Sequence, residues 1–394
     1  MGESAEPPAR AGRRRWTIWA AAIAAVAVLT AVAVARDRRP TTETAEAPVP
    51  SHPVSPSPAP SPSPEPGADI TGPLNILLVG VDTRISVPDW QPHADAVLIM
   101  HVPAGLDRAY LFSLPRDLVV DIPSFPKAGF AGQRTKLTHA MSYGSRVPGR
   151  NNDPDYAQGL ELVAATVGDY TGIERFDAGA VITFQGFDAL VDAVGGVELY
   201  IDQRVVSRHR QPDGKHRKPG PGVGGYVGPQ MVYEVGSRHL NGWQALDYAR
   251  QRYIPGGTYA RERHQQQLIK AIVARIHSLD LARDPVRLGA MLNALDETLT
   301  FDGHGRSVID FAFALSRIPT DAITLVSLPG HGVGSGSGYR GEALEAISRE
   351  FLAELRAGRV EPFLAANPDL VVPDPPGHGT PSPTGNARRP PITP

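Results

Sequence analysis

The stretch LNILLVGVDTR, which runs from Leu74 to Arg84, indicates the class of fold. Its first seven residues are a short aliphatic run of the kind that forms a buried β-strand. Polar residues, among them Asp82 and Arg84, follow directly after this run. Because ligands collect where the strands of an α/β sheet end, the stretch predicts a strand of a central sheet with a candidate site beside it.

Five further apolar runs alternate with helical patterns, and together they predict a layered α/β/α domain with one central mixed β-sheet flanked by helices. The predicted strands are 74–80, 96–102, 109–114, 179–184, 196–201 and 322–328. The predicted helices are 157–170, 185–194, 242–250, 261–277, 285–298, 306–316 and 341–356. Residues 203–238 are rich in glycine, proline and basic side chains, so we expect a long loop or insertion there.

The composition narrows the class of protein. With 394 residues, 41% of them hydrophobic, the chain can bury one large core or two modest ones. A formal net charge of -2 gives no strongly basic domain, and no recognition helix is evident, so nucleic acid is not an expected partner. Cysteine is absent, which excludes disulfides and thiol chemistry.

The N-terminal region predicts a membrane anchor. Residues 16–35 form an uncharged, mostly apolar run, and its length is enough for a helix to cross a bilayer. Four arginines precede this run, which favours a cytoplasmic N-terminus and an extracellular, wall-facing remainder. A cleaved signal peptide is the alternative, but the run exceeds the roughly 7–15 residues of a typical signal-peptide core, and Arg36 follows it directly.

Proline-rich segments flank the predicted domain, and neither has an apolar period to bury. We therefore expect five parts. They are a cytoplasmic N-terminus (1–15), a transmembrane helix (16–35), an extracellular linker (36–70), a folded domain (71–367, with the insertion at 203–238) and a disordered tail (368–394).

Two acidic residues lie at the ends of neighbouring predicted strands. Asp82 follows the first strand and Asp95 precedes the second. Two carboxylates at one edge of a sheet suit an octahedral Mg²⁺, or Mn²⁺ in its place, that substrate phosphate also holds. An aspartate after a strand is also a common cap or turn former, and that interpretation stays open.

Basic residues gather near the same edge. Arg116 and Asp117 follow the third strand, next to a proline that ends the ladder. A cation together with arginines is the arrangement that phosphoryl transfer uses. Asp117 is a candidate base, although we favour a role in holding Arg116. Lys136 is a further donor, with an ordinary surface lysine as the alternative.

The stretch ALDYARQRYIPGGTYARERHQQQLIKAI (Ala245–Ile272) is also basic. Its helical pattern puts Arg261, His264 and Gln265 in the first turn, on the face that later turns bury. Such groups need an anion or a hydrogen-bond partner, and the helix dipole favours a phosphate there.

Three arginines of this stretch lie off that face. Arg250 and Arg252 point together if the chain is extended between them. Arg263 is expected on the opposite, solvent-facing side of the helix. A solvated basic loop is the alternative interpretation of the whole stretch.

Seven motifs, in order over residues 75–276, resemble the LytR-CpsA-Psr family. They are NILLVGVDTR, ADAVLIMHV, SLPRDLVVDIP, KLTHAMSYG, FQGFDALVDAVGGVEL, HLNGWQALDYARQR and RERHQQQLIKAI. Members of that family are single-pass, wall-facing enzymes of mainly Gram-positive bacteria. They move a glycopolymer from a polyprenyl diphosphate carrier onto peptidoglycan. The high Gly, Pro, Ala and Arg usage suggests an actinobacterial source.

The resemblance implies roles for individual residues. It implies that Asp82 and Asp95 hold Mg²⁺, and that 184–196 and 268–276 line an apolar cavity for the lipid tail. The candidate catalytic residues are Arg116, Asp117, Arg250 and Arg252. The candidate diphosphate-binding residues are Arg84, Arg116, Lys136, Arg250, Arg252, Arg261, His264 and Gln265.

This chain departs from the family pattern at three places. His93 stands where many members have arginine, and Ala96 stands in place of the usual threonine. The family's acidic DFGR-like segment is here Thr258 to Arg261, without an acidic residue. The basic insertion is a candidate contact for polyanionic wall polymer.

The resemblance implies a phosphotransferase reaction. The C6 hydroxyl of N-acetylmuramic acid would attack the phosphorus nearer the glycopolymer and expel polyprenyl phosphate. Two alternatives remain open: a polyprenyl diphosphate hydrolase, with water as the acceptor, and a non-catalytic binder of lipid-linked wall polymer.

Overall fold

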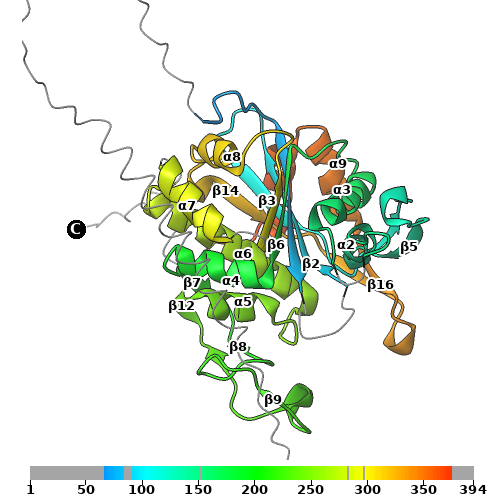
Figure 1. Ribbon diagram of the computed structural model, residues 1–394, viewed down its shortest axis with the longest axis vertical. Coiled ribbons are helices and arrows are strands. Elements are labelled where there is room, and N and C mark those ends of the chain that lie inside the picture. The colour runs from blue at the N-terminus through cyan, green and yellow to red at the C-terminus, as the bar shows by residue number, and fades with distance from the viewer. Residues whose placement is uncertain (1–65, 84–90, 151–152, 282–283, 296–297, 375–394) are drawn as a thin grey trace, which may run out of the picture. The chain divides into compact units, whose positions relative to one another are not determined.

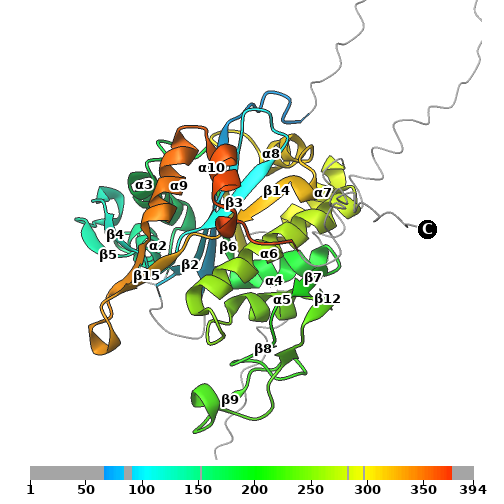
Figure 2. The same cartoon turned by 180° about the vertical axis from the view of Figure 1, so that it is seen from behind.

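The computed structural model describes residues 66–83, 91–150, 153–281, 284–295 and 298–374 (Figures 1 and 2). The predicted cytoplasmic segment, membrane helix and most of the linker lie outside these residues, as do Arg84 and residues 375–394. Within the described ranges, no helix combines the length and the apolar character that a bilayer crossing needs.

The described residues form a central six-stranded sheet in the order β13-β6-β1-β2-β3-β14. Its strands are β1 (Leu74–Asp82), β2 (His93–Val102), β3 (Ala109–Ser113), β6 (Ala178–Thr183), β13 (Leu299–Asp302) and β14 (Ile323–Val326). β1 is parallel to β6 and β3 is parallel to β14, while the other neighbours are antiparallel. The predicted mixed sheet is confirmed.

Helices cover both faces of this sheet, as Figures 1 and 2 show. One face packs against α2 (Thr138–Gly144), α3 (Tyr156–Thr171), α9 (Ala346–Arg356) and α10 (Val360–Ala366). The other face is covered by α4 (Phe184–Ala193), α5 (Gly242–Arg250), α6 (Gly257–Ser278), α7 (Pro285–Leu295) and α8 (Val308–Leu315). In β1, Leu77 and Val79 belong to the first core, whereas Leu74 and Ile76 belong to the second. Burial on both faces explains why β1 is an almost continuous apolar run.

One predicted strand lies outside the central sheet. β7 (Val197–Ile201) pairs with β12 (Gly236–Leu240) in a separate two-stranded ribbon. Burial along β7 alternates: Val197, Leu199 and Ile201 are buried, and Glu198 is exposed. A strand with one buried face fits a ribbon that packs on a helix better than a sheet covered on both sides. β13, which the sequence did not reveal, takes the edge position instead.

The helix after the basic stretch begins earlier than predicted. α5 matches its predicted bounds and carries a capping box between Asn241 and Gln244. α6 begins at Gly257 rather than Arg261, because Gly256 and Gly257 adopt positive φ angles of 85° and 53° that other residues rarely reach. Arg261 therefore lies in the second turn of α6, and its predicted position in the first turn is wrong.

The C-terminal part also differs from the prediction. The expected helix 341–356 divides into β16 (Gly341–Leu344), which forms a hairpin with β15 (Gly330–Val333), and α9. The folded chain also continues beyond the predicted boundary at residue 367. The Ser327 amide donates to the Leu370 carbonyl at 2.8 Å and the Val372 amide to the Leu325 carbonyl at 2.9 Å, which fastens this segment to β14.

Short strands complete the described fold. β4 (Val119–Ile122) and β5 (Gln133–Lys136) form a ribbon after β3. Residues 203–238 contain β8 (Val205–Val206), β9 (Lys218–Pro219), β10 (Tyr226–Val227) and β11 (Val232–Tyr233), paired as two small ribbons. These ribbons follow β7 and precede β12 in the chain, and Figure 1 shows β8 and β9 away from the central sheet.

Candidate functional site

The two predicted metal ligands lie where β1 and β2 meet. Asp82 is the last residue of β1 and its side chain is 8% exposed. The register of the two strands shifts between Gly80 and Val81, so Asp95 is the additional residue of a β-bulge. A bulge redirects a side chain relative to the regular pleat. Both carboxylates therefore belong to one short section of the sheet edge.

Arg116 and its neighbours form a charged chain beside Asp95. Arg116 makes an ion pair with Asp95, and its Nε lies 3.7 Å from Asp117. Lys136 Nζ lies 3.2 Å from the other oxygen of Asp117. Burial works against the charge of Arg116, but Asp95 and Asp117 outweigh it and raise its pKa. Burial likewise opposes the charge of Asp117, yet Arg116 and Lys136 lower the pKa of this carboxyl.

Arg250 approaches the same edge from the end of α5. Its guanidinium lies 3.7 Å from Asp82 and 4.2 Å above the ring of Phe184, the first residue of α4. The ring face attracts the cation and also fixes its orientation. Arg250 thus contacts both the sheet edge and a helix that covers the sheet.

Arg261 is the most deeply buried cation of the group, with 5% of its surface exposed. Burial, together with the nearby Arg116, lowers its pKa. The Nε–H groups of Arg261 and Arg116 are both buried and make no hydrogen bond among the described residues, although Arg116 Nε faces Asp117 at 3.7 Å. Buried donors without acceptors are rare in native proteins, so the Nε–H of Arg261 is a candidate for contacting an anionic ligand. We call the whole charged group the arginine rim. Its members are Arg116, Arg250, Arg261, Lys136, Asp82, Asp95 and Asp117.

An apolar cavity of about 220 Å³ opens beside the arginine rim. Its lining comes from the sheet, α4, α5 and α6, and includes Leu78, Ala96, Ala180, Phe184, Phe187, Leu190, Leu268, Ile269 and Ile272. Arg250 and Gln265 are its polar lining residues. Three residues from each predicted wall segment, 184–196 and 268–276, line this cavity, and Arg250 belongs to both the cavity and the rim.

Other predicted site residues lie elsewhere. His264 has no exposed surface; its Nε2 lies 3.0 Å from Asp202, and its ring stacks on Tyr248. Arg263, expected in solvent, also pairs with Asp202, at 2.7 Å. Arg252 is exposed and stacks on Tyr253 rather than pointing with Arg250. His264 and Arg252 therefore do not join the arginine rim, because both contact partners outside it.

Sequence reasoning missed a second group of residues behind Arg261. Burial raises the pKa of Glu262 to about 8, with Arg261 opposing this shift and Glu342 and Asp117 adding to it. Glu342, on β16, accepts hydrogen bonds from Tyr259 at 3.1 Å and Tyr339 at 2.7 Å. In the sequence, Glu262 stands between two arginines, a pattern typical of a solvent-exposed charge. Glu342 lies in a segment that was predicted as a helix and forms a strand. The sequence carried no signal for either residue.

The donor chemistry of the edge fits a hard divalent cation. No group of three or more His, Cys, Asp or Glu side chains is arranged to hold a metal in the part of the chain that the structure describes. Asp82 and Asp95 instead supply two carboxylates at one edge. Mg²⁺ commonly takes one or two carboxylates and completes its shell with water and phosphate oxygens. The pair therefore fits Mg²⁺ only together with a phosphate ligand.

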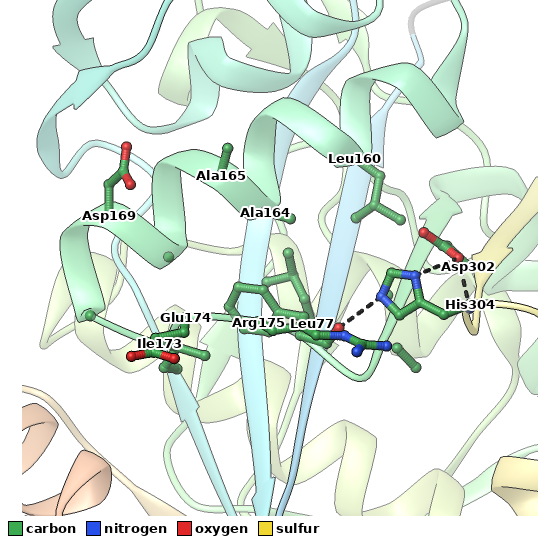
Figure 3. A pocket seen from close by; sticks show the side chains of 15 residues that line it. Leu77, Leu160, Ala164, Ala165, Asp169, Ile173, Glu174, Arg175, Asp302 and His304 are labelled. Atoms are coloured by element: carbon green, nitrogen blue, oxygen red, sulfur yellow. Dashed lines mark hydrogen bonds and ion pairs between the residues drawn. The ribbon is translucent and has the colours of Figure 1, made fainter.

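A larger hollow of about 480 Å³ lies between α3 and β6, away from the arginine rim (Figure 3). Leu160 and Ala165 of α3 lie on one side of it, and Asp302 and His304 on the other. His304 Nε2 donates to the Phe176 carbonyl at 2.9 Å, so this polar group already has a partner. None of the predicted site residues lines this hollow.

Comparisons with known proteins show the family of the chain. The profile of the LytR_cpsA_psr family matches residues 30–355. The chain is 27% identical over 253 residues to "Polyisoprenyl-teichoic acid--peptidoglycan teichoic acid transferase TagU" of Enterococcus faecalis, covering 64% of this chain and 70% of that protein. It is 25% identical over 298 residues to "Cell wall biosynthesis protein LcpA" of Corynebacterium glutamicum, covering 70% of this chain and 53% of that protein.

Solved structures share the fold. Protein gbs0355 from Streptococcus agalactiae superposes with a TM-score of 0.53 at 24% identity, covering 72% of this chain and 88% of that one. A structure described as "TagT bound to LI-WTA" gives a TM-score of 0.52 at 20% identity, covering 75% of this chain and 94% of that one.

Proposed function

The chain belongs to the LytR-CpsA-Psr family, and from this premise we propose that it is a phosphotransferase that moves a glycopolymer from a polyprenyl diphosphate carrier onto peptidoglycan. One observation carries the proposal: Arg250 lines the apolar cavity and also lies 3.7 Å from Asp82 in the arginine rim. A ligand that fills both places must have an apolar part joined directly to an anionic part. A polyprenyl diphosphate has this structure.

The donor would bind with its tail in the apolar cavity and its diphosphate at the arginine rim. The cavity supports this because its lining is aliphatic and aromatic except for Arg250 and Gln265. The rim supports it because Arg261 offers a buried Nε–H that lacks an acceptor within the described residues, beside the cations Arg116 and Arg250. Hydrogen bonds from arginine to phosphate oxygens are charge-assisted and therefore strong.

Catalysis would come mainly from positioning and from fixed charge. Asp95 and Asp117 hold Arg116, and Phe184 holds Arg250, so these guanidinium groups need little reorganisation when charge develops on the diphosphate. Mg²⁺, or Mn²⁺, bound by Asp82 and Asp95 would supply further neutralisation of the phosphate oxygens. Such electrostatic preorganisation is the main contribution that proteins make to phosphoryl transfer.

Asp117 serves better as a positioning residue than as a base. Its carboxylate contacts Lys136 at 3.2 Å and Arg116 at 3.7 Å, and these cations lower its pKa. A carboxylate stabilised in this way is a weak proton acceptor. We therefore assign to Asp117 the task of holding Arg116 and Lys136 in place.

Residues 16–35 would anchor the protein in the membrane, with the catalytic domain on the outer, wall-facing side. Such an anchor keeps the arginine rim close to a donor that is itself held in the bilayer. The proline-rich linker would extend the domain towards the acceptor.

The full chain in detergent, given a short polyprenyl diphosphate saccharide, peptidoglycan oligomers and Mg²⁺, tests this function. A saccharide linked to peptidoglycan is the expected product. Free saccharide phosphate would identify a hydrolase, and donor recovered intact would identify a binder. Either of these two outcomes contradicts the proposal.

A further inference from the structure

The insertion at residues 203–238, here called the basic arm, carries an excess of positive charge. It contains seven lysine or arginine residues and two acidic residues. Both acidic residues are already paired: Glu234 with Arg204 at 3.1 Å and Asp213 with Lys215 at 2.7 Å. The other five cations have no ion-pair partner among the described residues; they are Arg208, Arg210, Arg217, Lys218 and Arg238. In a chain of net charge -2, this is a local cationic surface.

A buried arginine gives the basic arm a defined conformation. Arg217 is 4% exposed, and its guanidinium donates to the carbonyls of Arg208 at 2.8 Å, Tyr226 at 3.1 Å and Gly228 at 3.3 Å. These contacts cross-link three segments of the arm without a carboxylate. The charge of Arg217 therefore adds to the field of the arm, and the arm's backbone is held in place before any ligand binds.

The base of the basic arm is fastened to the helix that carries Arg250. Ser207 donates to Asp247 at 3.0 Å, and Tyr233 donates to the other oxygen of Asp247 at 2.9 Å. The Arg208 amide donates to the Gln251 side chain at 3.1 Å. Asp247 lies three residues before Arg250 and Gln251 directly follows it, so the arm starts beside the arginine rim.

Charges of both the basic arm and the arginine rim act on one side chain of the arm. Burial lowers the pKa of His216, and the charges of Arg210 and Arg250 lower it further. Tyr253, 65% exposed, has the guanidinium of Arg208 4.0 Å from its ring centre and that of Arg252 5.2 Å from it. The Nε and Nη2 of Arg208 donate to the Gly224 carbonyl at 3.0 and 2.8 Å, which leaves its Nη1 for a phosphate oxygen.

We propose that the basic arm binds the phosphodiester backbone of an anionic glycopolymer, so that the enzyme selects donors whose polymer is itself negatively charged. This inference rests on the proposed function, because a diphosphate held at the arginine rim places the attached polymer next to the arm. Tethering of this kind raises the effective concentration of the polymer, so weak contacts to successive phosphates suffice. An anionic membrane surface is the competing partner, since Val223 and Val227 are exposed on the arm.

Binding of a synthetic poly(glycerol phosphate) oligomer of about ten units to the full chain tests the inference. We expect binding that weakens steeply with salt, and a loss of about tenfold in Arg208→Gln/Lys218→Gln, with a shallower salt dependence. The matched control Arg204→Gln/Lys215→Gln changes the net charge equally, but removes cations that carboxylates already neutralise. Its affinity should remain within about twofold of the wild type.

The double variant could lose affinity because removing Arg208 unfolds the basic arm. The single variant Lys218→Gln avoids this, because Lys218 is exposed and its replacement should leave the fold of the arm intact. It should lose about threefold in affinity. Two results would overturn the inference: equal losses in both double variants, or no binding of the oligomer while vesicles of phosphatidylglycerol bind in an arm-dependent manner. A neutral dextran oligomer should not bind.

Transfer assays separate this inference from the proposed function. With a short neutral donor saccharide, Arg208→Gln/Lys218→Gln should transfer as fast as the wild type, while transfer from a phosphodiester-containing donor falls about tenfold. Equal rates from both donors in this variant would overturn the arm's role alone. Absence of transfer by the wild type would overturn the proposed function, and the oligomer binding would still decide the role of the arm.

Discussion

Two hollows within the described residues, the one between α3 and β6 and the apolar cavity beside the arginine rim, differ in a way that volume does not capture. The larger one, about 480 Å³ between α3 and β6, is lined in part by His304, whose ring is bonded to the Phe176 carbonyl. The smaller one, about 220 Å³, is almost wholly apolar and opens at a rim where a buried arginine donor lacks an acceptor within the described residues. Unsatisfied charge beside an apolar wall marks a binding site more reliably than size does.

This difference has an energetic basis. Burying a guanidinium group without acceptors costs free energy that a folded protein normally recovers through hydrogen bonds. Arg261 keeps that cost in the described structure, where burial lowers its pKa. A hydrogen bond to a ligand anion would offset this cost. The buried arginine therefore lowers the stability of the free protein and strengthens the binding of an anion. The larger hollow has no such reserve.

Replacing one arginine from each region should give the largest contrast. We expect Arg250→Ala to lower kcat/KM about 10²–10³-fold, as loss of a preorganised charge donor does elsewhere. Arg175→Ala, in the lining of the larger hollow, should leave kcat/KM within about twofold. Steady-state kinetics with a short polyprenyl diphosphate donor measure both. Similar losses in the two variants would remove the distinction between the regions.

Filling each hollow gives the next largest effect. Ala180→Leu narrows the apolar cavity and should displace two to three methylene groups of the tail, at about 0.8 kcal/mol each, so KM should rise about ten- to fiftyfold. Ala165→Leu adds the same atoms to the larger hollow and should leave KM unchanged. If shortening the lipid does not rescue Ala180→Leu, the tail lies elsewhere.

Replacing His264 tests whether this residue stabilises the fold or binds the diphosphate. Its loss in His264→Ala leaves Asp202 and the Tyr248 ring without their partner, so the free energy of unfolding should fall by about 1–2 kcal/mol in urea denaturation. KM should change less than threefold. A rise in KM as large as that of Arg250→Ala would return His264 to the diphosphate site.

The last prediction concerns the pH dependence of stability. Glu262 has a pKa of about 8 in the folded chain and about 4.5 when unfolded, because burial disfavours its charge. Between these values the unfolded chain binds fewer protons, so this residue lowers stability as pH rises, by up to about 1.4 kcal/mol per pH unit. Glu262→Gln should flatten this slope. Urea denaturation at pH 5.5 and 7.5 checks it, and an unchanged slope would contradict it.

The sequence predicted most of the fold because its central strands and long helices have clear apolar periods. It placed β7 wrongly because a strand with one buried face looks like a sheet strand in local pattern alone. It also placed β16 in a helix, since the short apolar segment before α9 continues the helical period. Pairing partners far apart in the chain decide such cases, and a single sequence does not reveal them.

The candidate site was predicted in part for similar reasons. Asp82, Asp95, Arg116, Arg250 and Arg261 come together because strand ends and helix ends converge at one edge, which the order of elements implied. Glu262 was missed because the sequence does not reveal its burial, and Glu342 because its strand, β16, was predicted as part of a helix. The role of His264 was predicted wrongly because its partner, Asp202, lies on a neighbouring element that periodicity does not identify.

The affinity of the full chain for a short polyprenyl diphosphate, compared with the polyprenyl alcohol of the same length, tests the central claim most directly. If the apolar cavity and the arginine rim bind one ligand, the diphosphate should bind at least about a hundredfold more tightly, and the double variant Arg116→Ala/Arg250→Ala should abolish that difference. Equal affinities for the two lipids in the wild type, or a preference that survives in the double variant, would contradict the account.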